Sequence, residues 1–471
     1  MKKIINSKNN KSPKSTNQDA IRLHQEGLKF CLFGDKNRAV KCLKQSINLD
    51  KDYADPYFQL GNIYIQSEEF DLSEAMLETA IKLNNQNPDF YYNLAITKYI
   101  LNKTEEAILN YRESLKLDPN NSKALKFLGN CYKDIKNFNE ALKIYNSWHT
   151  LEPENPEPTF NKSLLHIRNG RFDVGWNLYE VGLKNNIREP LNGFYHETKK
   201  YWNGIPFDGT LLVYGEQGLG DQIVFGTILP ELLKDQPNVI VKVNKKLRSL
   251  FKDSYPKITV YSENDLIDGN LYQKYISMGS LCKFYRKHTD DFMKSEFKSY
   301  SLNQSLPKRF REQINNLNNL KIGFSWLTFA DNNRQQRSLT SYDVSKILNC
   351  NDNSFINLQY GKVSGSVSEI NNLSKNKLIS IKGLDLTNDI DNVVNVIKHC
   401  DLVVTIDNTL AHLASSLGKH VWILLPYSAD FRWMENVTAT LWYENALLLR
   451  QSKIGNWNNV IETIKQAFSK S

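Results

Sequence analysis

A period of 34 residues across positions 20–189 constrains the fold of this chain more than any other feature. Repeat frames begin at Ala20, Ala54, Pro88, Ser122 and Pro156. The eighth and twentieth residues of each frame are small, and the twenty-fourth is large. The small residues are Gly27, Gly61, Ala95, Gly129 and Ser163, then Ala39, Ser73, Ala107, Ala141 and Gly175, and the large ones are Leu43, Leu77, Tyr111, Tyr145 and Tyr179. Antiparallel helices cross closely only where side chains are small, so the pattern predicts a superhelix of stacked helix pairs.

Proline marks the ends of the later frames. Pro119 and Pro153 stand at the thirty-second position, where they break the chain before the next repeat. Trp148 departs from the pattern, because the other frames have a small residue at that position, and it indicates a local adjustment. On these residues the segment 20–189 resembles a tetratricopeptide repeat (TPR) array, with its fifth frame the weakest. Such an array is either a passive spacer or, as we favour by analogy of fold, a concave groove that binds a protein partner.

Composition and charge limit which partners and which cellular location we expect for this chain. Residues 1–19 are rich in Lys, Asn and Ser, and no apolar segment follows, so we expect a disordered basic tail and no signal peptide. The net charge of +9 is mild for 471 residues. It indicates a solvated basic surface, anionic ligands such as nucleotides, or peripheral contact with an anionic membrane. No apolar run approaches the ~18 residues of a membrane span. Six scattered cysteines without metal-ligand spacing favour a reduced, cytoplasmic protein.

Short apolar runs alternate with amphipathic ones after the repeats. The runs that predict strands are Thr210–Tyr214, Val239–Val243, Ile258–Tyr261, Tyr275–Met278, Lys321–Trp326, Phe355–Gln359, Leu378–Ile381, Leu402–Ile406, Val421–Leu425 and Ala446–Leu449. This alternation is typical of βαβ units and predicts parallel sheets. We therefore expect two Rossmann-like lobes, at residues 190–310 and 311–471, the second ending in a helix from Trp457 to Phe468.

The first candidate motif, Gly215–Gln222, follows a predicted strand and opens a helix. Gly218 and Gly220 let backbone amides approach a ligand closely, and a helix N-terminus favours negative charge. No third glycine completes the dinucleotide fingerprint, which argues against a nicotinamide enzyme. Asp221, at the start of the helix, is either a cap or a functional carboxylate.

The second candidate motif joins a strand that ends at Ile406 to a helix. Asp407, Asn408 and Thr409 form the junction, and His412 lies on the first turns of the helix. Free amides at such a helix start can hold a diphosphate. For His412 two interpretations remain open, a residue facing a cleft or a buried histidine with satisfied hydrogen bonds.

The two motifs, in this order, resemble those of the bacterial heptosyltransferase-like (glycosyltransferase family 9-like) enzymes. They resemble more closely a bacterial group in which TPR repeats precede such a domain. Further matches are Gly175-Trp176, Tyr179-Glu180, Trp202-Asn-Gly, Glu216-Gln-Gly, Arg337-Ser-Leu, Leu358-Gln-Tyr-Gly, Asp385–Asp391, Leu424-Leu-Pro, Arg432-Trp433 and Arg450-Gln451. The layout is shared with the O-linked N-acetylglucosamine transferases, whose motifs match less well. The resemblance covers nearly everything after the basic tail.

The resemblance implies a GT-B fold, with the nucleotide-sugar on the second lobe and the acceptor between the lobes. It implies that Asp221 is the catalytic base, and Glu216 is the next candidate. It also implies that a basic residue after the first strand of the second lobe binds the donor phosphates. Arg337 is the first candidate and Arg334 the second. The donor would further be held by Asp407, Asn408, Thr409 and His412.

The implied chemistry is an inverting sugar transfer to a protein or glycan acceptor, recruited in part by the TPR groove. A carboxylate takes the acceptor proton, and a helix N-terminus with a guanidinium stabilises the departing diphosphate. No Asp-x-Asp motif stands out, so we expect no essential metal, and no cofactor beyond the nucleotide-sugar as co-substrate. The alternative is a TPR adaptor whose transferase-like domain is inactive. Nucleic acid is not an expected partner, because no basic-aromatic cluster or zinc spacing occurs.

Overall fold

The chain divides into two compact units, residues 1–158 and 159–471, which we describe separately. The computed structural model describes residues 15–188, 200–329, 334–350 and 352–469. Most of the predicted basic tail, residues 1–14, lies outside the described residues. Within them, no helix is long and apolar enough to cross a membrane.

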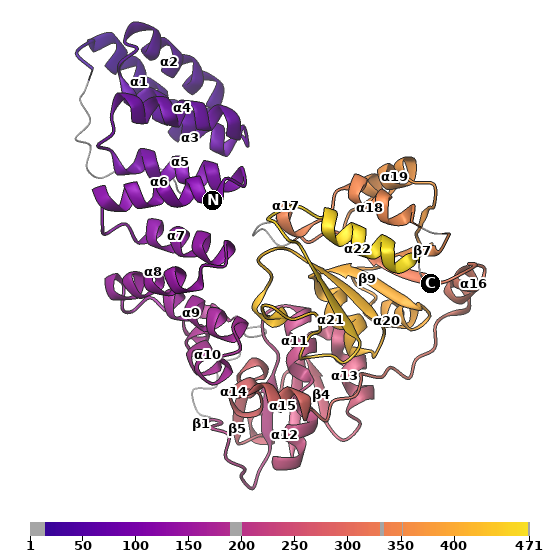
Figure 1. Cartoon of the computed structure of the whole chain (residues 1–471). Coiled ribbons are helices and arrows are strands. Elements are labelled where there is room, and N and C mark those ends of the chain that lie inside the picture. The colour runs from indigo at the N-terminus through magenta and orange to yellow at the C-terminus, as the bar shows by residue number, and fades with distance from the viewer. Residues whose placement is uncertain (1–14, 189–199, 330–333, 351, 470–471) are drawn as a thin grey trace. The chain divides into compact units, whose positions relative to one another are not determined.

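The first unit is a stack of antiparallel helix pairs, which Figure 1 shows in chain order from indigo to purple. Its helices are α1 Gln18–Leu32, α2 Lys36–Leu49, α3 Ala54–Gln66, α4 Phe70–Leu83, α5 Pro88–Ile100, α6 Thr104–Leu117, α7 Ser122–Asp134 and α8 Phe138–Leu151. Asparagine caps start several of them. The side chains of Asn17, Asn87 and Asn121 accept hydrogen bonds from the first amides of α1, α5 and α7. The predicted superhelix of helix pairs is confirmed.

The small eighth residue of a frame makes room for the large twenty-fourth residue of the same frame. A Cβ atom at Gly129 would lie 2.4 Å from Tyr145 Cε1, and one at Gly61 would lie 2.7 Å from Leu77 Cγ. Tyr145 and Leu77 are both fully buried. The large residue thus packs inside its own helix pair, against the helix that carries the small residue. Trp148 is buried too, and its Nε1 donates to Glu152 Oε2 at 2.9 Å.

The fifth frame belongs to the second compact unit. It forms α9 Glu157–Arg168, α10 Phe172–Tyr179 and the 3-10 helix η1 Glu180–Asn186. Trp176 and Tyr179 are buried, and both rings contact Phe225 and Phe431 of the α/β region. The last repeat therefore shares the hydrophobic core of the segment that follows it.

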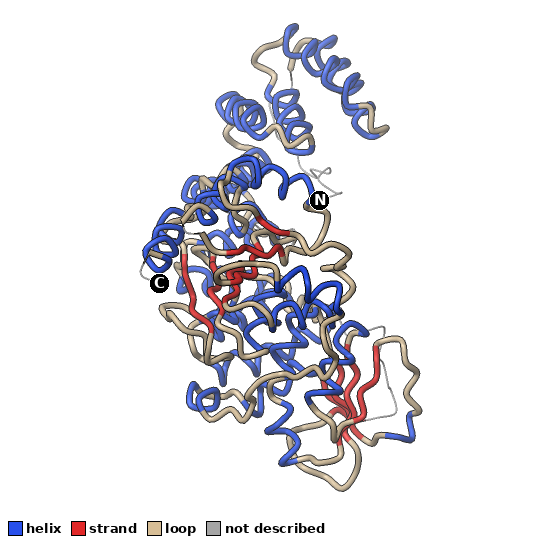
Figure 2. The backbone as a smooth tube through the Cα atoms, turned by 90° about the vertical axis from the view of Figure 1, so that its right-hand side faces the viewer, coloured by secondary structure: helices blue, strands red, loops and turns tan. Residues whose placement is uncertain are grey.

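Two parallel sheets build the rest of the second unit, and Figure 2 shows their strands in two separate groups. The first sheet has the order β1-β5-β2-β3-β4. Its strands are β1 Lys200–Tyr201, β2 Leu211–Tyr214, β3 Val239–Val243, β4 Thr259–Ser262 and β5 Lys274–Ser277. The second sheet has the order β11-β10-β9-β6-β7-β8. Its strands are β6 Lys321–Ser325, β7 Ser354–Asn357, β8 Leu378–Ile379, β9 Leu402–Ile406, β10 Val421–Leu425 and β11 Ala446–Arg450. The predicted alternation of strands and helices in parallel sheets is confirmed, although the short β1 was not expected.

Helices connect and cover these strands. They are α11 Leu219–Gly226, α12 Leu229–Asp235, α13 Arg248–Ser254, α14 Cys282–Tyr285, α15 Thr289–Met293, α16 Lys308–Asn315, α17 Arg334–Arg337, α18 Ser341–Leu348, α19 Ser364–Leu373, α20 Ile390–Lys398, α21 Thr409–Ser416 and α22 Asn458–Phe468. The shorter 3-10 helices are η2 Lys245–Leu247, η3 Gly269–Leu271, η4 Met278–Leu281 and η5 Phe431–Trp433.

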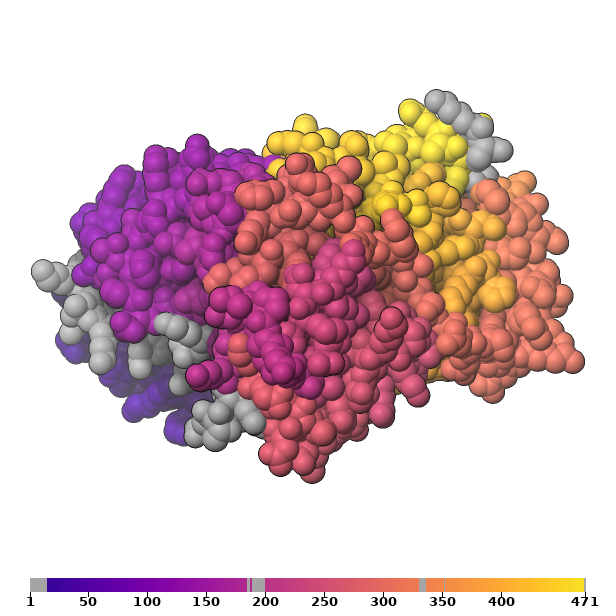
Figure 3. All heavy atoms as spheres, turned by 90° about the horizontal axis from the view of Figure 1, so that it is seen from below, coloured from indigo at the N-terminus to yellow at the C-terminus, as the bar shows by residue number. Residues whose placement is uncertain are grey.

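One continuous core links the two sheets. Its buried side chains come from both, from Leu211 in β2 to Leu448 in β11. Tyr300 ties the segment between the sheets to α21, because its amide donates to the Ser416 carbonyl at 2.7 Å. In the space-filling view, yellow C-terminal residues lie directly against the orange residues that come before them in the chain (Figure 3). The loops at the carboxyl ends of both sheets can therefore contribute to one site.

Candidate active site

The order of the strands locates a switch point in each sheet. In the first sheet the chain proceeds from β2 toward β3 on one side and places β5 on the other. In the second, β6 continues to β7 on one side and lies beside β9 on the other. Ligands of open α/β sheets bind outside the carboxyl ends of strands at such points. The two motifs identified in the sequence stand there, since α11 follows β2 and α21 follows β9.

The two motifs touch each other. A Cβ atom at Gly220 in α11 would lie 3.0 Å from His412 Cδ2 and 3.8 Å from Thr409 Cα in α21. A side chain at position 220 would crowd the His412 ring, so glycine suits the close approach of the helices. The turn before α11 is strained, because Gln217 has a φ of 55°, a value that non-glycine residues rarely adopt.

Asp221 has both carboxylate oxygens engaged. Its Oδ2 accepts from the Gly218 amide at 3.1 Å, which makes it part of the cap of α11. Its Oδ1 forms an ion pair with Nη2 of Arg432, in η5 after β10. Asp221 therefore caps α11 and is also paired with an arginine that follows a strand of the second sheet.

Glu216 is completely buried and paired with Arg188. Arg188 Nε donates to its Oε1 at 3.0 Å and Nη2 to its Oε2 at 2.8 Å, and the Ser277 hydroxyl also donates to the carboxylate. Burial raises the pKa of Glu216, and the Arg188 charge opposes that rise. The pair joins the segment just after η1 to the carboxyl ends of β2 and β5. This placement favours a structural role for Glu216 over that of a base.

Asp407 and Arg337 lie together, as an ion pair. Arg337 Nη2 donates to Asp407 Oδ2 at 3.2 Å and to its carbonyl at 3.0 Å. Trp433 Nε1 donates to Asp407 Oδ1 at 2.6 Å. The Arg337 side chain is 24% exposed, so it is held at the end of β9 and still reaches solvent. The side chain of Arg334, the second candidate, lies outside the described residues.

Asn408 caps α21 and connects three strand ends. Its Oδ1 accepts from the amides of Leu410 and Ala411, and its Nδ2 donates to Ser325 Oγ at 2.9 Å. Ser325 in turn donates to Gln359 Oε1 at 2.8 Å. We expected free amides at this helix start, but the Asn408 side chain satisfies two of them. The start of α21 therefore offers fewer free amides to an anion than the sequence predicted. Thr409, the first residue of α21, is half-buried.

His412 is a buried, neutral ring. It stacks on Trp433 with centroids 4.7 Å apart and an angle of 16°, and its Nδ1 lies 3.1 Å from the Tyr443 hydroxyl. Burial lowers its pKa to about 4. At neutral pH His412 therefore supplies shape and a hydrogen-bonding edge, without positive charge.

Several residues without an assigned role complete the site. Arg450 Nη2 donates to the carbonyls of Trp433 and Met434. Met434 has a φ of 50°, so this loop is strained as well. Arg432-Trp433 and Arg450-Gln451 were visible in the sequence as family-like pairs, but the contacts that give them a role join distant parts of the chain. Within the described residues, no cluster of three or more His, Cys, Asp or Glu could hold a metal ion.

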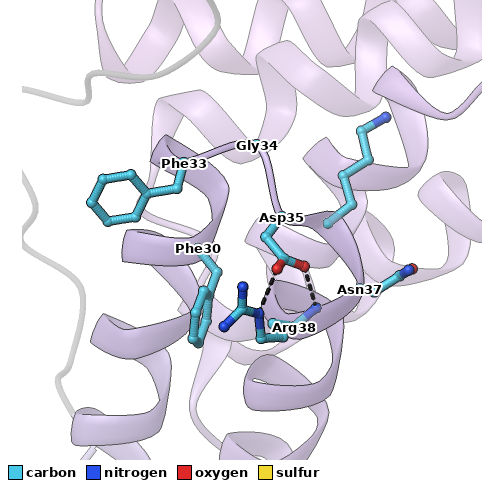
Figure 4. Close-up of a pocket in the computed structure, with 7 residues that line it drawn as sticks. Phe30, Phe33, Gly34, Asp35, Asn37 and Arg38 are labelled. Carbon is cyan, nitrogen blue, oxygen red and sulfur yellow. Dashed lines mark hydrogen bonds and ion pairs between the residues drawn. The ribbon is translucent and has the colours of Figure 1, made fainter.

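A hollow in the first unit has a different character. Figure 4 shows it at the turn between α1 and α2, lined by Phe30, Phe33, Asp35 and Arg38 among others. Asp35 accepts from the Arg38 amide at 3.0 Å and caps α2, and the Arg38 guanidinium lies 4.8 Å from the centre of the Phe30 ring. These contacts account for the turn without a ligand.

Comparison with known proteins identifies the first unit. Family models of the TPR repeat match residues 27–68, and models of the tetratricopeptide repeat match residues 54–87 and 88–121. The N-terminal array is a TPR solenoid. Solved structures similar to the chain include MamA, at 18% identity and a TM-score of 0.33, covering 34% of this chain and 94% of that one. Another is YrrB, a TPR protein, also at 18% identity and a TM-score of 0.33, covering 36% of this chain and 89% of that one.

Curated relatives match at low identity. Protein FlbA of Caulobacter vibrioides is 22% identical over 423 residues, which cover 84% of this chain and 70% of FlbA. Human protein O-mannosyl-transferase TMTC3 is 26% identical over 202 residues, which cover 41% of this chain. Anaphase-promoting complex subunit 3 of Schizosaccharomyces pombe is 25% identical over 29% of this chain. The matches span only 22% of TMTC3 and 21% of the anaphase-promoting subunit.

Proposed function

We propose that this chain is a glycosyltransferase of the GT-B type, inverting and independent of metal. It moves a sugar from a nucleotide-sugar to a protein or glycan acceptor that the TPR solenoid helps to recruit. The observation that carries the proposal is a set of guanidinium N–H groups that are buried and have no hydrogen-bond partner within the described residues. They are Arg337 Nε, Arg432 Nε and Arg450 Nη1.

Unpaired N–H groups on buried cations are costly, so their presence at a strand-end switch point supports an anionic ligand. A diphosphate offers several acceptor oxygens and a charge that matches guanidinium groups. Arg337 and Arg432 are 24% and 13% exposed, which leaves part of each side chain accessible. The two facing sheets, whose motifs meet at Gly220 and His412, support a donor and an acceptor bound between them.

The TPR solenoid and one curated relative bear on the class of acceptor. TMTC3 is named as a protein O-mannosyl-transferase, and its match covers 41% of this chain. That likeness, with the presence of a TPR solenoid, supports a protein acceptor beside the glycan alternative. A TPR array offers an extended concave surface for a protein ligand.

Donor binding tests the proposal directly. Calorimetry of the full chain in EDTA should detect at least one of UDP-glucose, UDP-N-acetylglucosamine, GDP-mannose and ADP-glucose. Arg337→Ala and Arg450→Ala should each weaken that binding at least about tenfold, as expected for a charge-assisted hydrogen bond of about 1.5–3 kcal/mol. Arg311→Ala, which removes an exposed arginine on α16, is the matched control. Strict dependence on a divalent ion would contradict the metal-independent form of the proposal.

The ion pair between Asp221 and Arg432 favours a second candidate, a TPR adaptor with an inactive domain, because the expected base is already neutralised. The two candidates differ in turnover. Release of nucleoside diphosphate from a bound nucleotide-sugar supports the enzyme, whereas tight binding without release supports the adaptor.

A further inference from the structure

Arg432 connects two carboxylates at the carboxyl ends of the sheets. Its Nη2 is paired with Asp221 at the start of α11, and its Nη1 donates to Asp430 Oδ1 at 2.6 Å. Asp430 Oδ1 also accepts from the Arg432 amide at 3.1 Å and caps η5. One guanidinium therefore fixes two carboxylates that come from different sheets.

The two carboxylates differ in what they leave free. Asp221 uses Oδ1 for Arg432 and Oδ2 for the Gly218 amide, and its side chain is 14% exposed. Asp430 uses only Oδ1. Within the described residues its Oδ2 has no hydrogen-bond partner, and its side chain is 32% exposed. Hydrogen bonds to Oδ1 thus orient Asp430, while Oδ2 is available to accept a proton. A proton acceptor requires this geometry.

Charged groups surround Asp430 on several sides. Arg432 lies on its own loop, Asp407 and Arg337 face it from the ends of β9 and α17, and Arg168 faces it from α9. Although its side chain is 32% exposed, Asp430 lies among packed protein groups, and their desolvating effect and the Asp407 charge raise its pKa to about 7, against the opposing effect of the arginines. A base with a pKa near the working pH combines sufficient basicity with a large deprotonated fraction.

The other candidates for a base are less suited. Both oxygens of Asp407 are engaged by Trp433 and Arg337. Glu216 is completely buried against Arg188. His412, with a pKa of about 4, is a weak acceptor at neutral pH.

On the basis of the proposed function, we propose that Asp430 is the proton acceptor of the transfer, and that Asp221 is a positioning residue that holds Arg432. The acceptor hydroxyl oxygen forms a bond to the anomeric carbon as the bond from that carbon to the diphosphate oxygen breaks. The hydroxyl proton passes to Asp430 Oδ2, and the electron pair of the broken bond leaves with the nucleoside diphosphate. Arg432, held between Asp221 and Asp430, lies where it can stabilise that departing charge.

The test compares Asp430→Asn with Asp221→Asn in the full chain. Donor affinity is measured by calorimetry, and release of nucleoside diphosphate is measured with water as the acceptor, for whichever of the four nucleotide-sugars named above binds. Asp430→Asn should lower the release rate roughly 10²–10⁴-fold, the usual contribution of a general base, with donor affinity within about threefold. Asp221→Asn keeps the cap but loses the charge pair, so its release rate should fall less. The wild-type rate should rise with pH and level off above neutrality.

A carboxyl ¹³C titration adds a readout that does not depend on turnover. The aspartate resonance that is lost in Asp430→Asn should titrate near neutral pH in the wild type, and titration near pH 4 would overturn the proposal. Asp430→Ser, which removes the carboxylate but can still cap η5, checks that the Asn variant is not simply misfolded. A bound donor with near-normal release in both Asp430 variants would overturn the role of Asp430 alone. Absence of donor binding in the wild type would instead overturn the proposed function.

Discussion

The Arg168 guanidinium, at the end of α9 in the fifth repeat, is paired with Glu435 in the loop that carries Trp433. Arg168 Nε donates to Glu435 Oε1 at 2.6 Å, and the two side chains are only 3% and 5% exposed. The Glu435 amide also donates to the Arg168 carbonyl at 3.1 Å, and Arg168 Nη1 donates to Ser428 Oγ at 3.0 Å. The fifth repeat thereby positions the loop that contains Asp430 and Arg432.

Removing one partner of this pair should be costly. Arg168→Met takes the paired guanidinium away from the buried Glu435 carboxylate, and we expect a loss of about 3–5 kcal/mol in the free energy of unfolding. Urea unfolding of the full chain, followed by tryptophan fluorescence, measures it. The double variant Arg168→Met, Glu435→Met removes both charges and should recover most of the loss. A single variant as stable as the wild type would show that the pair is not important for stability.

The contact between Gly220 and His412 makes a second prediction. Gly220→Val places branched carbon atoms where a Cβ alone would already lie 3.0 Å from His412 Cδ2. Overpacking at this contact should lower stability by about 1–3 kcal/mol and weaken donor binding as the helices separate. Gly365→Val in α19 is the control, since nothing lies within 4 Å of its Cβ position. Equal melting temperatures for the two variants would contradict the close approach of α11 and α21.

The TPR solenoid offers a third test at Gly129. A Cβ atom there would lie 2.4 Å from Tyr145 Cε1, so Gly129→Leu should destabilise the array by about 1–3 kcal/mol or more. The double variant Gly129→Leu, Tyr145→Ala opens space at the same contact and should recover part of the loss. Thermal unfolding of the full chain is the measurement. Truncation at residue 189 is unsuitable, because Trp176 and Tyr179 pack in the core of the second unit.

Local patterns predicted the elements of this chain well. The 34-residue period placed the starts of α3, α5 and α7 at Ala54, Pro88 and Ser122, because small residues and turn signals recur within each helix pair. Apolar runs placed strands such as Val239–Val243 and Leu402–Ile406 residue for residue, since buried parallel strands are continuous in sequence. The two sequence motifs also lie in the segments that meet at Gly220.

Such local patterns could not predict contacts between side chains that are far apart in the sequence. Nothing near Glu216 in sequence indicates that Arg188 neutralises it, and Arg432 lies far along the chain from Asp221. The weak fifth frame is explained by the same limit. Its residues Trp176 and Tyr179 contact Phe225 and Phe431, which lie outside the repeats. Which carboxylate is free and which is paired depends on these contacts.

The burial of His412 predicts a pH dependence of stability. Its pKa is about 4 in the folded chain, below its ordinary value of 6.5, so the unfolded chain binds a proton between these pH values and the folded chain does not. Stability therefore rises with pH through this window and falls as the solution is acidified from pH 6.5 to pH 4. At pH 5 the loss of stability from His412 amounts to about 2 kcal/mol relative to pH 7, at 1.36 kcal/mol for each pH unit below 6.5.

The variant His412→Phe tests this, because it keeps a ring on Trp433 and removes the titrating group. The difference in unfolding free energy between wild type and His412→Phe, measured in urea at pH 7 and pH 5, cancels groups that titrate alike in both proteins. We expect the wild type to lose about 2 kcal/mol more than the variant, and an equal loss in the two would show that His412 is protonated in the folded chain.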